Sequence, residues 1–251
     1  MKELARREGP FGTVRIVERR QDGARLYCID DGVQTLARPD GTSLFGYVHA
    51  IKLLVGDAPN VLMLGGGGGS LATMLARRNR DVTVVDIDPA AESLARRYFG
   101  LDPRVAWITG DGLAYLEACT RRFEAVVIDT CDAHGLVPTF MTQDNLLTAM
   151  KVLTPTGSLI LNLAGDGNRP DVAWQLACAM VASGQSAALF RSDLGEEGNE
   201  LLHVRSRGPT ALIEIGDLYE RPLEARLYLM SLRAFVPRST APAAVAPRLS
   251  Q

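Results

Sequence analysis

The stretch VLMLGGGGGS, residues 61–70, joins a short apolar run to five consecutive glycines. The apolar run is typical of a buried β-strand, and residues 70–79 after it have the spacing of an amphipathic helix. Glycine loses more backbone freedom on folding than any other residue, so this run indicates a backbone that turns tightly or lets something approach closely. Between a strand and a helix, its amide N–H groups could meet a nucleoside or a phosphate. Alone, the pattern also fits a tight turn without a ligand.

The same order of elements recurs along the chain after residue 59. Five segments that resemble short buried strands are each followed by a segment with helical spacing. Their ranges are 60–64 with 70–79, 81–88 with 89–100, 104–112 with 113–122, 123–130 with 143–153, and 157–165 with 170–184. Such alternation predicts a parallel sheet covered by helices on both faces. Segments 186–193, 199–207 and 210–217 can add edge strands, and the pattern of 219–235 predicts a last helix.

The chain divides into three predicted parts. Residues 1–58 form a small β domain with strands at 13–20 and 24–30, closed by a helix over 43–56. Residues 59–236 form the α/β domain. Residues 237–251, rich in Ala and Pro and without periodicity, are expected to be a disordered tail.

The composition is that of an ordinary globular protein. Of 251 residues, 47% are hydrophobic and 22% charged, and the net charge is −2. We therefore expect neither nucleic acid nor a membrane as a partner, because so small a charge attracts neither. The opening MKELARREGPFG lacks the apolar core of a signal peptide, and the four cysteines lie far apart. These features predict a cytoplasmic protein with reduced thiols.

Acidic residues follow three successive strands, at the edge of the predicted sheet where the glycines lie. Asp86 is placed where a carboxylate can accept both hydroxyls of a ribose. Asp111, in TGDG, could read an adenine amino group, and VVIDTCD brings Asp129 and Asp132 to the same edge. An Asp after a strand is also common in turns. Three such positions beside a glycine run predict a nucleoside site.

Two kinds of nucleoside cofactor compete for this site. Residues 67–72 satisfy the G-x-G-x-x-A pattern of a nicotinamide dinucleotide fold, whose ribose Asp86 would also suit. A pyrophosphate, however, favours positive or neutral surroundings, and the further acids make these surroundings negative. S-adenosylmethionine and its decarboxylated form are cationic sulfonium compounds. We therefore expect a sulfonium nucleoside.

These motifs together resemble one known family. From residue 11 to about 165 the sequence is similar to the spermidine synthase (polyamine aminopropyltransferase) family, a branch of the S-adenosylmethionine methyltransferase fold. The family's G-G-G-D-G-G stands here as residues 65–70, its E-I-D as 86–88, its G-D-G as 110–112 and its D-S-S-D-P-x-G-P as 129–136. The implied fold is a Rossmann-like α/β domain, with a mostly parallel seven-stranded sheet, preceded by the small β domain. The implied nucleoside-binding residues are Gln34, Gly65, Gly66, Gly67, Gly69, Asp86, Ile87, Asp111 and Gly112.

The departures from the family fall on the half of the site that grips amines. The acid of the glycine motif, which in the family holds the amine of the aminopropyl group, is Gly68 here. Phe45 replaces a tyrosine, with Tyr47 close by, and the prolines of the last motif are Ala133 and Leu136. The nucleoside half is retained.

The resemblance implies transfer of an aminopropyl group from decarboxylated S-adenosylmethionine to a small amine. Asp129 would orient the ammonium and accept its proton, Asp132 would hold a second cationic group, and Tyr47 would contact the acceptor. Because Gly68 lacks the acid, an S-adenosylmethionine-dependent methyltransferase stays open as an alternative, and a non-catalytic nucleoside-binding relative as a third. The resemblance also implies a homodimer.

The remaining polar candidates carry weaker expectations. His, Cys and carboxylate residues show no metal-ligand spacing, so we expect no metal. His134 lies in the last motif and His49 near the rim of the site, and for each a merely structural or solvent-facing role is the alternative. His203 falls in a late strand, and Trp107 and Trp174 are expected in the core.

Overall fold

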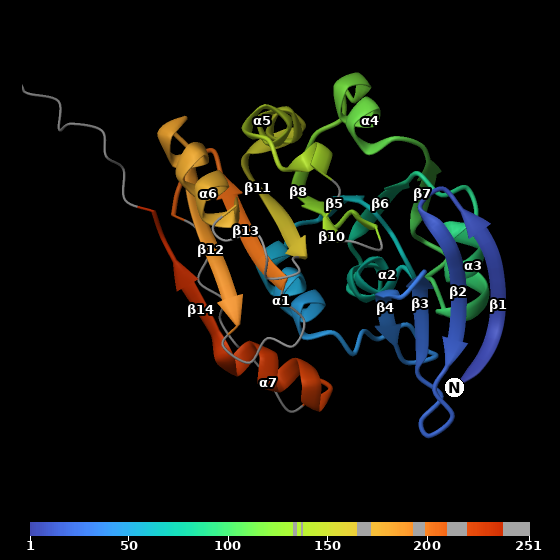
Figure 1. The fold of residues 1–251 in the computed structure, drawn as a ribbon. Coiled ribbons are helices and arrows are strands. Elements are labelled where there is room, and N and C mark those ends of the chain that lie inside the picture. Colours follow the sequence, from blue (N-terminus) through green and yellow to red (C-terminus); the bar gives the residue numbers. More distant parts are fainter. Residues whose placement is uncertain (133–134, 137, 165–171, 193–198, 210–219, 238–251) are drawn as a thin grey trace, which may run out of the picture.

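The structure, a computed structural model, describes residues 1–132, 135–136, 138–164, 172–192, 199–209 and 220–237. The predicted strand at 210–217, residues 238–251 of the predicted tail, and His134 lie outside these ranges. In the described residues the strands form a four-stranded sheet, an eight-stranded sheet and a short two-stranded ribbon (Figure 1). The ribbon pairs β9 (Cys131–Asp132) with β10 (Gly135–Leu136).

The four-stranded sheet is formed by the N-terminal part of the chain. Its strands are antiparallel and neighbours in chain order: β1 (Lys2–Gly9), β2 (Gly12–Glu18), β3 (Arg25–Ile29) and β4 (Gly32–Ala37). The charged β1 was not singled out from the sequence. Val14, Ile16 and Tyr27 on this sheet pack against Leu94 of helix α3 (Ala91–Tyr98), which lies beside it (Figure 1), and against Phe99 at the end of that helix. The N-terminal sheet is thereby fixed to the rest of the molecule.

The eight-stranded sheet has the order β14-β12-β13-β11-β8-β5-β6-β7. Five neighbouring strands are parallel: β5 (Asn60–Leu64), β6 (Asp81–Asp86), β7 (Ala106–Thr109), β8 (Phe123–Ile128) and β11 (Leu153–Ala164). Three antiparallel strands complete it: β12 (Ser186–Ser192), β13 (Asn199–Arg205) and β14 (Leu232–Phe235). The five predicted strand-to-helix repeats are confirmed. The predicted number of seven strands is wrong, because β14 adds an eighth.

The eighth strand comes from a segment that was expected to be helical throughout. The predicted helix over 219–235 is shorter, α7 (Leu223–Ser231), and ends where Leu232 turns into the extended conformation. Residues 232–235 then pair antiparallel with β12, so that Phe190 faces Ala234 in the register. Residues 232–235 form a strand because they pair with β12, which is distant in the sequence. The spacing of apolar residues within 219–235 does not reveal that pairing.

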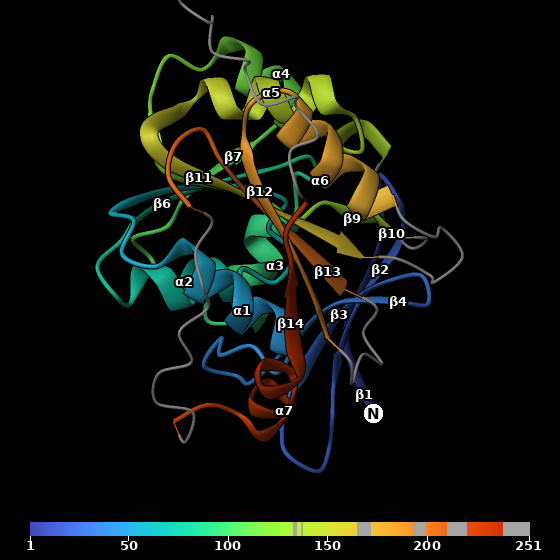
Figure 2. The ribbon, with the colours of Figure 1, turned by 90° about the vertical axis from the view of Figure 1, so that its left-hand side faces the viewer.

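Helices cover both faces of the large sheet (Figures 1 and 2). One face carries α1 (Gly46–Val55), α2 (Ser70–Ala76), α3 (Ala91–Tyr98) and α7. The other carries α4 (Gly112–Ala118), α5 (Gln143–Lys151) and α6 (Val172–Ala182), with a short 3₁₀ turn at Pro138–Phe140 before α5. This is the three-layer arrangement that the strand–helix alternation predicts.

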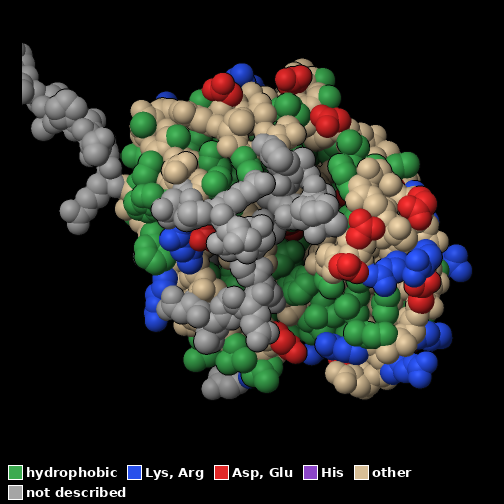
Figure 3. Space-filling view, viewed as in Figure 1, with side chains coloured by type: hydrophobic (Ala, Val, Ile, Leu, Met, Phe, Trp, Pro, Cys, Tyr) green, Lys and Arg blue, Asp and Glu red, His purple; other side chains and the backbone are tan. Residues whose placement is uncertain are grey.

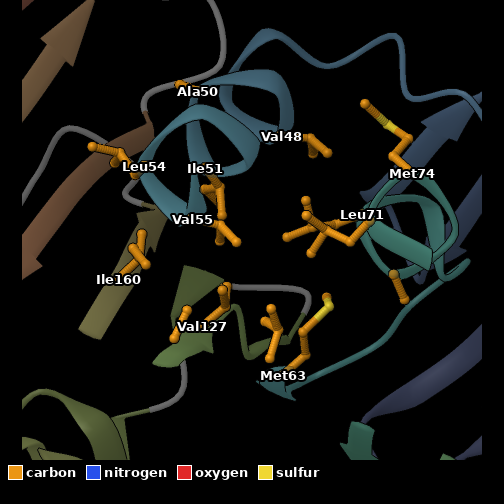
Figure 4. Close-up of a cluster of buried hydrophobic side chains, with 14 of the residues drawn as sticks. Val48, Ala50, Ile51, Leu54, Val55, Met63, Leu71, Met74, Val127 and Ile160 are labelled. Atoms are coloured by element: carbon orange, nitrogen blue, oxygen red, sulfur yellow. The ribbon is translucent and has the colours of Figure 1, made fainter. Parts of the chain in front are cut away.

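Each strand of the parallel part sends alternate side chains into the two helix layers. Val61 and Met63 of β5 face α1 and α2, whereas Leu62 and Leu64 face the opposite layer. Figure 4 shows the first of these clusters, in which Ile51 and Val55 of α1 approach the sheet. Helix α1 therefore belongs to the core of the large sheet. The sequence had placed this helix with the N-terminal β unit.

Candidate functional site

A cavity of about 470 Å³ opens at the carboxyl ends of the parallel strands. The chain runs from β5 outward to β6 and β7 on one side, and through β8 and β11 on the other, so the strand order reverses between β5 and β8. Residues just after these two strands, Gly65 and Asp129, both line the cavity. Open α/β sheets bind ligands at such a switch point, and this volume suits a small molecule.

The glycines of the run are packed tightly against other parts of the protein. Gly65 has a φ of +86°, and a side chain there would collide with the carbonyl group of Asp129. A side chain on Gly66 would collide with the ring of Trp107, and one on Gly69 would lie 2.6 Å from Leu101. The glycines are therefore required first by the turn and by the close approach of protein atoms.

The amide groups of this run are already engaged within the protein. Gly66 N–H donates to Asp86 Oδ2 (2.7 Å), and Gly68 N–H donates to the Thr35 hydroxyl (2.9 Å). Gly65 and Gly69 N–H donate to backbone carbonyls of Val85 and Gly66. These four N–H groups therefore donate to protein acceptors, and a contact between the glycine run and a nucleoside stays a prediction. A pyrophosphate would find them occupied.

Asp86 ends β6 and braces the turn. One carboxylate oxygen accepts the Gly66 N–H, and Oδ1 accepts the N–H of Asp88 (2.9 Å). Burial raises the pKa of the Asp86 carboxyl, and these backbone N–H groups oppose the increase because they favour the charged form. The remaining lone pairs of a carboxylate leave room for the ribose hydroxyls of a ligand.

An apolar rim surrounds this end of the cavity. Phe11, Val33 and Ile87 line it and are 39%, 42% and 44% exposed. They come from the β1–β2 turn, from β4 and from the end of β6. Exposed large apolar side chains that gather at one opening are typical of a ligand site.

Asp111 and Gly112 begin helix α4 at the same edge. Asp111 caps the helix, since its Oδ1 accepts the N–H of Ala114 (2.8 Å). Both residues line the cavity. Capping of helix α4 is therefore a structural reason for an Asp at position 111. The second carboxylate oxygen of Asp111 remains available for a ligand.

Asp129 follows β8 at the base of the cavity, next to Asn162 near the end of β11. Asn162 Nδ2 donates to Asp129 Oδ1 at 2.7 Å. Burial raises the pKa of the Asp129 carboxyl, and the hydrogen bond from Asn162 partly opposes this. A carboxylate whose pKa lies above its usual value can act as a proton acceptor near the reaction centre.

Ten of the predicted site residues come together around the cavity. They are Gln34, Tyr47, Gly65, Gly66, Gly67, Asp86, Ile87, Asp111, Gly112 and Asp129. Gly69 does not line it and instead precedes α2, against Leu101. Asp132 is described through its backbone in β9, paired with Gly135. The role proposed for its side chain stays a prediction.

The cavity is acidic. Asp86, Asp88, Asp111 and Asp129 line it, and no Lys or Arg of the described residues does. Asp88 is paired with Arg7 at 3.4 Å, outside the lining. Elsewhere on the face in Figure 3, acidic and basic side chains are intermingled. The accumulation of one sign of charge is thus a property of the cavity, and it favours a cationic ligand.

The place of the missing family acid is filled. A side chain on Gly68 would meet Thr35 Cγ2 and the Phe99 ring at 2.9 Å. The second departure, Phe45 in place of a tyrosine, lies at the cavity itself. The rings of Phe45 and Tyr47 stack with their centroids 5.6 Å apart, and both residues line the cavity. At both positions of departure the space is thus occupied by packed side chains of this protein.

The histidines and tryptophans have structural surroundings. The buried His49 donates from Nε2 to the carbonyl of Ser43 (2.9 Å), and His203 is buried in β13. Trp107 and Trp174 pack against the two core clusters, as expected.

In the described part of the chain no three His, Cys, Asp or Glu side chains gather as metal ligands would. No helix among these residues is long and apolar enough to cross a bilayer.

Among the cavity residues that were not predicted from the sequence, three lie against the turn or the predicted carboxylates. Thr35 braces the glycine turn, Asp88 lies beside Asp86, and Asn162 contacts Asp129. Asn162 had a visible signal, because it is the one strongly polar residue in the apolar run LILNLA. Thr35 had none, since its contact joins two parts of the chain 33 positions apart.

The fold and the position of the cavity define a Rossmann-like protein of the methyltransferase type. Residues 47–171, about half of the chain, match the family described as "Spermine/spermidine synthase domain". Over this segment the chain belongs to that family.

The chain is also similar to individual curated relatives and to solved structures. A polyamine aminopropyltransferase of Korarchaeum cryptofilum is 28% identical over 126 residues, which are 47% of this chain and 39% of the relative. An eEF1A lysine and N-terminal methyltransferase homolog of Drosophila pseudoobscura is 34% identical over 121 residues, 41% of this chain and 17% of the relative. The crystal structure of a probable spermidine synthase from Corynebacterium glutamicum has a TM-score of 0.70 at 16% identity, covering 92% of this chain and 89% of that one. The chain thus spans well under half of the two curated relatives, and the solved structure supports the fold.

Proposed function

We propose that this protein transfers an aminopropyl group from decarboxylated S-adenosylmethionine to a small amine. The observation that carries the proposal is the charge of the cavity, which four aspartates line without a Lys or Arg among the described residues. A sulfonium donor and an ammonium acceptor are both cations. The family assignment and the retained Asp129 support the same reaction.

The geometry favours the sulfonium compound over a dinucleotide. Asp86 and Ile87 line the cavity, where they are proposed to bind the nucleoside, while the amides of the glycine run that would hold a pyrophosphate already donate to protein acceptors. Negative charge along the cavity would repel the two phosphates.

The reaction is one in-line displacement. The acceptor nitrogen attacks the aminopropyl carbon attached to sulfur, a C–N bond forms, and the C–S bond breaks with its electron pair left on sulfur. The neutral thioether methylthioadenosine leaves. An alkyl ammonium has a pKa near ~10 in water, so the nitrogen must lose a proton first, and Asp129 accepts it. Holding both reactants at attack distance supplies much of the acceleration.

A methyltransferase acting on S-adenosylmethionine is the second candidate. It is favoured by Gly68, because the acid that holds the donor amine in the family has no room beside Thr35 and Phe99. The insect relative named as a methyltransferase, which matches nearly the same share of the chain, also supports it. In this reaction the same nitrogen attacks the methyl carbon, and S-adenosylhomocysteine leaves.

A transfer assay tests the proposal. Wild-type protein is incubated with 1,4-diaminobutane and either donor, and the products are identified by mass spectrometry. We expect methylthioadenosine and an aminopropylated amine from the decarboxylated donor. Methylated amine and S-adenosylhomocysteine would establish the second candidate instead.

The variant Asp129→Asn assigns the chemistry to this site. We expect it to lose turnover, at least about 100-fold, because the amide cannot accept the proton. Its affinity for methylthioadenosine, measured by calorimetry, should stay within about twofold of wild type. Full activity in this variant would refute the role of Asp129.

A further inference from the structure

Arg7 of the N-terminal sheet reaches the cavity wall through Asp88. Arg7 lies on β1, and its guanidinium is 3.4 Å from Oδ1 of Asp88. Asp88 is 6% exposed and lines the cavity, and Arg7 stands behind it, outside the lining. The family match begins at residue 47, so Arg7 belongs to the part of the chain that precedes it. The pair joins the separate N-terminal sheet to the end of the cavity where Asp86 lies.

Asp88 is fixed in place by three further contacts. Its Oδ1 accepts the N–H of Ala90 (2.9 Å), and its Oδ2 accepts the hydroxyl of Tyr27 (3.4 Å). Its own backbone N–H donates to Oδ1 of Asp86 (2.9 Å). The carboxylate of Asp88 therefore stays at one position beside Asp86.

Two buried carboxylates so close together oppose each other's ionisation. Burial raises the pKa of Asp86, and the negative charge of Asp88 raises it further, whereas backbone N–H groups lower it. The Tyr27 hydroxyl adds no charge, because burial and these two carboxylates raise its pKa as well. Asp111 lines the same cavity with another carboxylate. Arg7 is the cation that faces this group of acids.

We infer that Arg7 is a positioning residue for the nucleoside, acting through Asp88: its positive charge balances that of Asp88 and keeps Asp86 ionised for the ribose hydroxyls. The part that concerns binding rests on the proposed function, whereas the effect on Asp86 does not depend on any ligand. An ionised carboxylate can accept from two hydroxyls as well as from the backbone, and a protonated one loses part of that capacity. The N-terminal sheet thereby contributes charge to the site in addition to the side chains with which it lines the cavity.

The test follows the protonation of Asp86 in the ligand-free protein. The amide N–H of Gly66 donates to Asp86 Oδ2 (2.7 Å), so its resonance in ¹⁵N NMR reports the titration of that carboxyl. For Arg7→Gln we expect the midpoint of the Gly66 titration to move to higher pH by at least about 0.5 pH unit, because a neighbouring positive charge is lost.

Asp88→Asn breaks the same ion pair with the opposite electrostatic effect. Asparagine keeps the backbone N–H to Asp86 and an oxygen for the N–H of Ala90, but it removes the negative charge and leaves Arg7 in place. The midpoint should therefore move to lower pH, again by at least about 0.5 pH unit. A purely structural role of the ion pair would move both variants in the same direction.

Arg6→Gln is the matched control. Arg6 precedes Arg7 on β1, points to the other face of the strand and pairs with Glu3 at 3.0 Å. Its loss should leave the Gly66 midpoint unchanged, because salt screens an exposed and distant charge. Folding of each variant is checked by chemical denaturation. Unchanged midpoints in folded Arg7→Gln and Asp88→Asn, midpoints that move in one direction in both, or an equal change in Arg6→Gln would overturn the inference.

Calorimetry with methylthioadenosine then connects this charge to binding. The pH below which the affinity declines should be higher in Arg7→Gln and lower in Asp88→Asn than in wild type. Opposite changes of the Gly66 midpoint without these changes in affinity would overturn the part that concerns binding. A wild type that binds no methylthioadenosine would refute the proposed function, while the Gly66 titration would still decide the effect of Arg7 on Asp86.

Discussion

The backbone carbonyl of Asp129 occupies the place that a side chain on Gly65 would take. The first glycine of the turn and the proposed base are thus in direct packing contact across the switch point of the sheet. Any residue larger than glycine at position 65 must displace the segment that positions Asp129. The glycine run therefore sets the geometry of the reaction centre through protein packing.

Gly65→Ala is expected to be strongly destabilising. Its φ of +86° costs a residue with a side chain about 1–2 kcal/mol, and the collision with Asp129 adds to this. Gly184→Ala is the matched control, because Gly184 has a φ of +85° with nothing within 4 Å. Chemical denaturation should show a larger loss for Gly65→Ala than for the control. Equal losses of stability in the two variants would mean that the positive φ alone, and not the collision with Asp129, destabilises Gly65→Ala.

Asp86→Asn should weaken nucleoside binding and the turn together. Asparagine has one acceptor oxygen, so the N–H of Gly66 or of Asp88 loses its partner, at about 1–3 kcal/mol. We expect the affinity for methylthioadenosine in calorimetry to fall at least about tenfold. Asp81→Asn, at the exposed start of the same strand, removes a surface pair with Arg121 and should change stability by less than about 1 kcal/mol. Unaltered binding in Asp86→Asn would exclude its ribose role.

Gly68→Asp is expected to fail as a restoration of the family motif. The new side chain would push into Thr35 and Phe99, and overpacking of this kind costs about 1–3 kcal/mol. Transfer from decarboxylated S-adenosylmethionine should not increase. Gly110→Ala, where nothing lies within 4 Å, should leave stability unchanged in the same denaturation experiment. A stable Gly68→Asp protein with raised aminopropyl transfer would contradict this packing.

His203 should make stability depend on pH. Burial lowers its pKa to about 4, whereas an unfolded histidine titrates near ~6.5. Between these values the unfolded chain binds the proton and the folded protein does not. The free energy of unfolding should therefore decrease as the pH falls from about 6.5 to 4, by on the order of 3 kcal/mol from this residue, and should not respond to it above that range.

The variant His203→Gln isolates this contribution, because glutamine does not titrate. The difference in stability between the two proteins, measured by denaturation at several pH values, should change between pH 6.5 and 4 and be constant above pH 7. A difference that is the same at every pH would show that His203 does not titrate as expected.

The sequence alone predicts the parallel half of the fold and most of the cavity. Periodicity places β5, β6 and β8, and the carboxyl ends of parallel strands must meet at one edge, so the positions of Gly65, Asp86 and Asp129 follow. The atoms that the glycines contact cannot be predicted from periodicity or from the direction of the strands. The bond from Gly66 to Asp86 depends on the pairing of β5 with β6, and the bond from Gly68 to Thr35 depends on how the separate N-terminal sheet packs against the turn.

Other features depended on partners far away in the chain. β14 was assigned to a helix because its pairing with β12 has no local signal. Gly69 was grouped with the lining residues because a motif gives spacing and not the direction in which a Cβ would point. Asn162 stands out as a polar residue in an apolar strand, yet only the register of β8 and β11 brings it to Asp129.

The preference of the cavity for a positively charged sulfur is tested most directly by calorimetric titration of the wild-type protein with three compounds. These are decarboxylated S-adenosylmethionine, methylthioadenosine, which is the same nucleoside with a neutral sulfur, and NAD. We predict that the sulfonium compound binds more tightly than methylthioadenosine, since four aspartates line the cavity, and that NAD does not bind. Tighter binding of the neutral thioether, or binding of NAD in place of either, would contradict the account.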